Sequence, residues 1–215
     1  MCGIVGYTGP QSAANPLIEG LRRLEYRGYD SAGIALGTAN QLFVAKKAGK
    51  LANLESELNS VPEVHSGIGH TRWATHGGPT DRNAHPHVDN EGKLAVIHNG
   101  IIENYSELKA ELQSKGHEFH SDTDTESVAH LLSDLRKEYG GDLTTAMREA
   151  VKRLRGSFTL LAVHADKPEL IVGVRRNSPL VVGLGEGENF MASDVAAFIE
   201  YTKRAVELGQ DEVVT

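Results

Sequence analysis

The only cysteine of this 215-residue chain is Cys2, which directly follows the first methionine. If Met1 is removed, Cys2 carries a free α-amino group beside its own thiol. An α-amine with a pKa of roughly 7.7–8.0 can accept a proton near neutral pH, where a thiol is mostly protonated. One residue can therefore supply both a nucleophile and its general base. The alternative interpretation is a small apolar cysteine at the start of an edge strand.

A thiol that attacks an amide also needs hydrogen-bond donors for the oxygen that becomes negative. Asn99 and Gly100 follow the apolar run 94–98 and offer a side-chain amide and an unobstructed backbone N–H. The same dipeptide is the commonest signal of a tight turn, so a turn is the alternative.

An amino-acid substrate requires a cation for its carboxylate and an anion for its ammonium group. Arg72 and Asp124 could supply these charges, although each by itself is typical of a surface charge or a helix start. Trp73 is the only tryptophan and fits either a core or a lid. For an isolated tryptophan the core is the usual place.

The spacing of apolar residues predicts one α+β domain in which short strands alternate with helices. Strands are expected around Ile4 to Tyr7 and at 32–36, 41–45, 67–71, 94–98, 157–164, 170–174, 180–184 and 190–192. Helices are expected from a cap at Asn15 to about Tyr26, at 51–58, from a cap at Asn104 to Gly116, at 122–140, from Asp142 through Leu154, and after a cap at 193–194. The stretch 72–92 lacks periodicity, and loops of this length are usually functional.

Composition places the chain among ordinary globular domains, with 40% hydrophobic and 24% charged residues. The net charge of −7 and the scattered basic residues argue against a nucleic-acid groove or an anionic membrane surface. No basic stretch precedes an apolar segment at the N-terminus, no apolar run approaches a membrane span, and a single cysteine cannot form an internal disulfide. A cytoplasmic location is therefore expected.

Two rival site types can be read from the sequence. The histidines that could share a metal ion are His85 and His87 with His70, His76 or His98. No cysteine pair or His-Glu-x-x-His motif accompanies them, and loop histidines are more often hydrogen-bonding groups. The glycine-rich stretch 183–187 could suggest a nucleotide, but a strand pattern follows where a helix would be needed. No cofactor or metal is therefore expected.

Taken together, five stretches resemble the class II glutamine amidotransferases, which are N-terminal-nucleophile hydrolases. They are 1–6, 71–77, 83–87, 98–104 and 123–126. The stretch 20–33 is similar, in addition, to the branch of that family that forms glucosamine 6-phosphate. The likeness extends over essentially all 215 residues. Sister amidotransferases, such as those forming asparagine or phosphoribosylamine, are the alternative, and only 21–33 separates them from this branch.

The resemblance implies a four-layer αββα sandwich and a role for each candidate residue. Cys2 would be the nucleophile and, through its amine, the base, and Asn99 with Gly100 would form the oxyanion hole. Arg72 would bind the α-carboxylate of glutamine, and Asp124 its α-ammonium group. The supporting residues that it implies are Trp73, Thr75 and His76 in a loop that closes over the substrate, and Arg27 near Cys2.

The reaction implied is the hydrolysis of L-glutamine to L-glutamate and ammonia through a γ-glutamyl thioester on Cys2. In complete members of the branch, the ammonia is passed to fructose 6-phosphate. Residues 2–215 are expected to form the glutaminase domain, and the sugar-isomerase domains that bind the hexose phosphate are expected to be absent from this chain. Glutamine is then its only expected partner, and homo-oligomer formation by a complete enzyme is left open.

Overall fold

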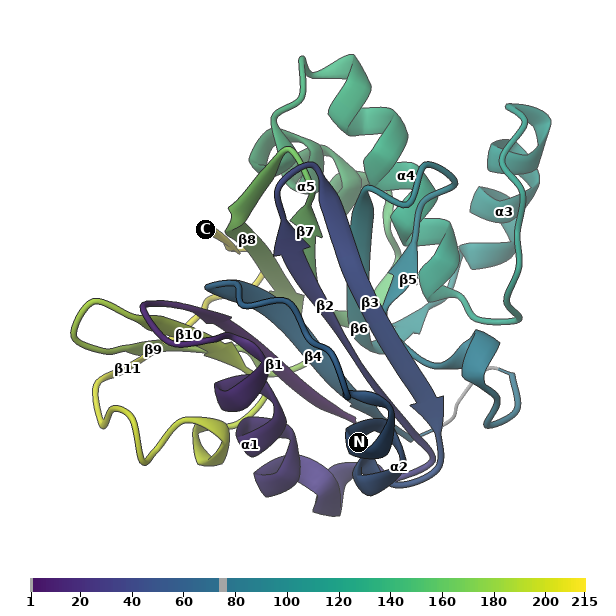
Figure 1. Cartoon of the computed structure of the whole chain (residues 1–215). Coiled ribbons are helices and arrows are strands. Elements are labelled where there is room, and N and C mark those ends of the chain that lie inside the picture. Colours follow the sequence, from purple (N-terminus) through teal and green to yellow (C-terminus); the bar gives the residue numbers. More distant parts are fainter. Residues whose placement is uncertain (1, 74–76) are drawn as a thin grey trace.

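Two antiparallel sheets packed face to face, with helices on both outer faces, form the molecule (Figure 1). The computed structural model describes residues 2–73 and 77–215. This order of layers confirms the expected αββα sandwich of the N-terminal-nucleophile hydrolase type.

The larger sheet has the strand order β11-β9-β10-β1-β4-β2-β3. Its strands are β1 (Gly3–Thr8), β2 (Ser31–Thr38), β3 (Gln41–Ala48), β4 (Ser66–Arg72), β9 (Val181–Leu184), β10 (Asn189–Ala192) and β11 (Ala205–Glu207). The predicted hairpin of β2 and β3 is confirmed, and Asn40 in its turn has a positive φ of 65°. The glycine-rich stretch 183–187 begins in β9 and continues into the turn toward β10, so it does not open a helix.

The smaller sheet has the order β12-β8-β7-β6-β5. Its strands are β5 (His87–Val88), β6 (Leu94–Ile102), β7 (Gly156–His164), β8 (Lys167–Arg176) and β12 (Val213–Val214). The short strands β5, β11 and β12 were not predicted. The strand β6, between β7 and β5, runs four residues beyond the predicted end at His98, which becomes important for the site.

Helices α1 (Ala14–Leu24) and α2 (Leu51–Glu57) pack on the larger sheet, and α3 (Tyr105–Ser114), α4 (Thr125–Glu138) and α5 (Leu143–Arg153) on the smaller one. Three 3-10 turns span Glu25–Arg27, Asp81–Asn83 and Val195–Ala197. Within the described residues, no helix combines the length and the apolar character needed to cross a bilayer.

One predicted helix cap is wrong, and another, Asn104, lies at the N-cap position of α3 without a side-chain cap bond. Helix α1 already begins at Ala14, so Asn15 lies inside it. The Asn104 side chain makes no cap bond and instead bridges the Arg153 carbonyl and the Arg155 N–H, which ties α3 to the end of α5. The caps at Asp142 and Asp194 are confirmed, because each carboxylate accepts a backbone N–H two residues later.

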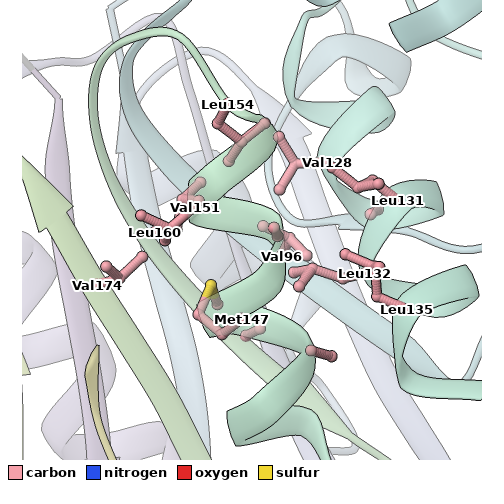
Figure 2. Packing of buried hydrophobic residues seen from close by; sticks show 14 of the residues in the cluster. Val96, Val128, Leu131, Leu132, Leu135, Met147, Val151, Leu154, Leu160 and Val174 are labelled. Atoms are coloured by element: carbon pink, nitrogen blue, oxygen red, sulfur yellow. The ribbon is translucent and has the colours of Figure 1, made fainter. Parts of the chain in front are cut away.

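Buried apolar residues fill all three spaces between the layers. Ile4 and Ile68 of the larger sheet meet Ile97 and Leu161 of the smaller one in the central space. Figure 2 shows the space between the smaller sheet and its helices, where leucines of α4 and a methionine and a valine of α5 cover Val96, Leu160 and Val174. Each such side chain contributes about 1.5–3 kcal/mol when fully buried. The result is a rigid base for residues at the end of the sandwich.

Candidate active site

Cys2 lies where the ends of β1 and β4 meet. The two strands pair antiparallel with Gly3 opposite Thr71, so the residue before β1 lies beside the residues that follow β4. The Cys2 thiol lies 3.5 Å from the Trp73 carbonyl and accepts a hydrogen bond from the Trp73 N–H at 3.2 Å. Burial raises the pKa of the thiol, and the Trp73 N–H opposes this effect. Because so little thiolate forms near neutral pH, a base is needed for attack.

Asn99 reaches Cys2 from the other sheet. Its side-chain Nδ2 donates to the Cys2 carbonyl at 2.9 Å. Asn99 and Gly100 lie inside β6, paired with Thr159 and Phe158, so the tight-turn alternative is wrong. Gly100 has a φ of 116°, and a Cβ there would approach the Ser157 carbonyl oxygen to 2.0 Å. Only glycine fits this position, and the backbone stays open toward solvent.

The Arg72 side chain is buried at the end of β4, with 3% of its surface exposed. Its guanidinium donates to the Gly77 carbonyl at 3.0 Å and to the Gly78 carbonyl at 3.3 Å. It therefore fixes Gly77 and Gly78, and Arg72 also lines the pocket beside Cys2. The prediction that Arg72 is an ordinary surface charge is wrong.

Asp124 is also buried, with 3% exposure, just before α4. It does not cap that helix, because its Oδ2 accepts the Ile102 N–H at 2.8 Å at the end of β6. Its Oδ1 lies 3.8 Å from His98 Nδ1, which in turn is 3.0 Å from the Thr125 hydroxyl. A buried carboxylate is thus fixed at the pocket, rather than exposed at a helix start.

Trp73 has 51% of its surface exposed and meets the ring of Tyr29 edge-on, with centroids 5.7 Å apart. A core position for Trp73 is therefore wrong. Thr75 and His76, which were expected in the closing loop, lie outside the described residues.

Arg27 reaches the N-terminal strand through intermediates. Its guanidinium donates to Asp194 at 2.5 Å and to the Tyr26 hydroxyl at 3.1 Å. Next to Asp194, Ser193 exchanges hydrogen bonds with Ile4, whose N–H donates to the Ser193 hydroxyl at 3.1 Å. Through Asp194 and Ser193, Arg27 is thus connected to Ile4, which follows Cys2 by two residues.

The buried histidines below the pocket act as hydrogen-bonding groups. His85 accepts the His98 N–H at 3.2 Å, and His87 lies 3.0 Å from the Thr123 hydroxyl. Burial holds the pKa of both His85 and His87 well below the usual range, so both are neutral. Among the described residues, no group of three or more histidine, cysteine or acidic side chains is arranged to hold a metal ion.

These side chains line one small pocket of about 30 Å³, which includes Cys2, Arg72, Gly100 and Asp124. A thiol, the backbone of Gly100, a cation and an anion converge there from the ends of β1, β4, β6 and α4. The arrangement suits nucleophilic attack on an amide that carries an amino-acid group. A larger cavity of about 230 Å³ between the sheets has a mainly apolar lining and includes none of these groups.

Comparison with known proteins gives consistent similarities. A family model described as a glutamine amidotransferase domain matches residues 70–200. The glutamine–fructose-6-phosphate aminotransferase of Streptomyces coelicolor is 64% identical over 218 residues, which cover 100% of this chain and 35% of that protein. The enzyme of the same name from Thermus thermophilus is 56% identical over 215 residues, with the same coverage of 100% and 35%. This chain therefore spans about a third of the length of these curated relatives.

Among solved structures, the glutamine phosphoribosylpyrophosphate amidotransferase from B. subtilis is similar with a TM-score of 0.81 and 27% identity. The match covers 99% of this chain and 46% of that one. A second structure, titled as the allosteric regulatory enzyme of purine biosynthesis, has a TM-score of 0.83 at 27% identity, with the same coverage of 99% and 46%.

Proposed function

The chain belongs to the class II glutamine amidotransferases, and from this premise we propose that it hydrolyses L-glutamine to L-glutamate and ammonia through a thioester on Cys2. The observation that carries the proposal is the contact of Cys2 with the Asn99 amide, whose Nδ2 donates to the Cys2 carbonyl at 2.9 Å. Cys2 and Asn99 come from different sheets, and Cys2 lines a pocket with Gly100, one buried cation and one buried anion.

The first half of the reaction forms the thioester. After removal of Met1, the α-amine of Cys2 takes the thiol proton while the sulfur attacks the side-chain carbonyl carbon of glutamine. The charge on the carbonyl oxygen is stabilised by the Asn99 Nδ2 and the Gly100 N–H. One N–H of the Asn99 amide is directed at the Cys2 carbonyl, which leaves the other for the substrate. The protonated amine then gives its proton to the leaving nitrogen, which departs as ammonia.

The second half returns the enzyme to its starting state. A water molecule gives a proton to the same amine and attacks the thioester carbonyl. The carbon–sulfur bond breaks, the sulfur recovers its proton, and glutamate leaves. The balance is one glutamine and one water consumed, and one glutamate and one ammonia formed. No further cofactor enters either step.

Substrate recognition follows from the two buried charges. Arg72 pairs with the α-carboxylate of glutamine, and Asp124 with its α-ammonium group. Trp73, Thr75 and His76 belong to the loop that covers the bound substrate. Arg27 supports the N-terminal strand through Asp194.

In its complete form, we propose, the protein passes the ammonia to fructose 6-phosphate and makes glucosamine 6-phosphate. This is supported by 64% identity over the whole chain to an aminotransferase of that name, against 27% to the phosphoribosylpyrophosphate enzyme. The same comparison disfavours a sister amidotransferase. Residues 2–215 form the glutaminase domain, and the domains that bind the hexose phosphate lie outside it. The cytoplasmic location stays a prediction from the sequence.

Glutamate release from glutamine tests the proposal. The intact mass of the purified protein first shows whether Met1 has been removed. The form that begins at Cys2 should release glutamate, whereas a Cys2→Ala variant and a form that retains Met1 should not. Turnover near the wild-type rate in either form would contradict the assignment of nucleophile and base to one residue. With fructose 6-phosphate added, this chain should still form only glutamate and ammonia.

A further inference from the structure

The Asn99 amide can help an oxyanion only in one of its two orientations. With Nδ2 toward Cys2 it presents a donor to the reacting oxygen, and after a half-turn about the last bond of the side chain it would present an acceptor. The two orientations have nearly the same shape, so packing alone does not choose between them. Hydrogen bonds at both ends of the amide must therefore make the choice.

His70 of β4 determines which atom of the Asn99 amide points away from Cys2. Its Nε2 lies 2.9 Å from the His98 carbonyl oxygen and 3.0 Å from the Asn99 side-chain oxygen Oδ1. A carbonyl oxygen can only accept, so the Nε2 must carry the proton. The second contact of that N–H must then be an acceptor too, which places Oδ1, and not Nδ2, toward His70. At the outer end, the Cys2 carbonyl independently requires a donor and selects the same orientation.

The surroundings of His70 keep this donor in place. The side chain is fully buried, and its ring stacks on His85 with centroids 4.1 Å apart and planes 18° apart. Burial lowers the pKa of His70 to about 3. The ring is therefore neutral at every ordinary pH and has a single proton to place. Its other nitrogen, Nδ1, has no hydrogen-bond partner among the described residues.

We infer that His70 is a positioning residue for the oxyanion hole: its Nε2–H holds the Asn99 amide with Nδ2 directed at the reacting carbonyl. The inference rests on the proposed function and adds to it a residue that is not among those lining the pocket beside Cys2. It also explains why a polar ring is fully buried between the two sheets, where an apolar side chain would pack equally well.

A double-mutant cycle between His70 and Asn99 tests the inference. His70→Phe removes the donor and keeps a flat ring. We expect it to lower kcat, with an upper limit of about 10²–10³-fold set by the loss of one oxyanion-hole donor, and to leave KM nearly unchanged. If His70 acts through Asn99, the double variant with Asn99→Ala should be no slower than Asn99→Ala alone. His70→Gln, whose amide N–H can reach Asn99, should recover part of the rate.

His130→Phe is the matched control, because His130 is also a fully buried histidine but lies on α4 against Phe119 and His117. It should leave kcat at the wild-type value. If His70→Phe does not fold, His70→Asn, whose shorter side chain stops short of Asn99, replaces it in the cycle.

Two results would overturn the inference: a wild-type kcat in the folded His70 variant, or losses in kcat that multiply in the double variant. Both presuppose that the wild-type protein releases glutamate and that Asn99→Ala slows it. If the wild-type protein releases none, the proposed function fails instead, so the two failures can be told apart.

Discussion

Replacing Asp124 by asparagine removes one charge from the pocket and changes little else in size. The Oδ2 of Asp124 accepts the Ile102 N–H at 2.8 Å, and that buried donor needs an acceptor in the variant as well. The new Oδ1 will take this place, which turns the new NH₂ group toward the pocket. The ammonium group of glutamine would then meet a donor where the wild-type protein offers a carboxylate.

The size of the effect follows from the burial of the site. Asp124 is only 3% exposed, so solvent can neither screen the pair nor replace the lost partner. Removing one member of a buried, hydrogen-bonded charge pair costs about 2–5 kcal/mol. At about 1.36 kcal/mol for each factor of ten, KM for glutamine should rise by roughly 30- to 5,000-fold. The donors for the oxyanion are unchanged, so kcat at saturation should fall much less.

Glutamate release over a range of glutamine concentrations separates KM from kcat. Asp166→Asn is the matched control, since Asp166 is a 46% exposed carboxylate at the turn between β7 and β8 and pairs with Arg136. It should leave both constants near their wild-type values. An Asp124→Asn protein with the wild-type unfolding temperature and a KM within threefold of wild type would refute the assignment of Asp124 to the substrate ammonium group.

Three further outcomes are expected. Arg72→Lys keeps the charge but loses the fork that holds Gly77 and Gly78, so KM for glutamine should rise about 10-fold, and an unchanged KM would contradict the role. Because burial raises the pKa of the Cys2 thiol, its alkylation by iodoacetamide in the form that retains Met1 should accelerate only above the pH at which a free cysteine reacts. A midpoint at or below that of free cysteine would contradict this. Gly100→Ala should destabilise the fold by at least about 1–3 kcal/mol in thermal unfolding, because its Cβ would meet the Ser157 carbonyl at 2.0 Å. Gly92→Ala, with a positive φ but open space, is its control.

The longer elements of the fold could be predicted because their apolar residues have a clear period. β1, the hairpin of β2 and β3, and helices α4 and α5 follow from that pattern. The short strands β11 and β12 could not, because two or three exposed or half-buried residues carry no alternation. Asn15 resembles a cap in sequence, but α1 begins one residue earlier, at Ala14. The sequence also does not show that the Asn104 side chain bonds to Arg153 and Arg155, which lie 49 and 51 residues further along the chain.

The sequence predicts a set of candidate site residues but not their geometry. Asn99 and Gly100 resemble a turn in sequence, and only the pairing of β6 with β7 shows that they continue a strand. Trp73 is 51% exposed, although a lone tryptophan in the sequence favours a core position. His70 was noticed only as a possible metal ligand, and its contact with Asn99 forms between residues of two sheets. Its one sequence signal is a polar ring inside the strand 67–71.

The most direct measurement of the central claim is the mass of the protein during turnover. Protein that begins at Cys2 is mixed with glutamine, quenched in acid within the first turnovers, and weighed intact. The proposed thioester predicts a species heavier by one γ-glutamyl group, attached at Cys2 and released by hydroxylamine, and predicts none in Cys2→Ala. Glutamate release without any such species, or the same species in Cys2→Ala, would contradict Cys2 as the nucleophile.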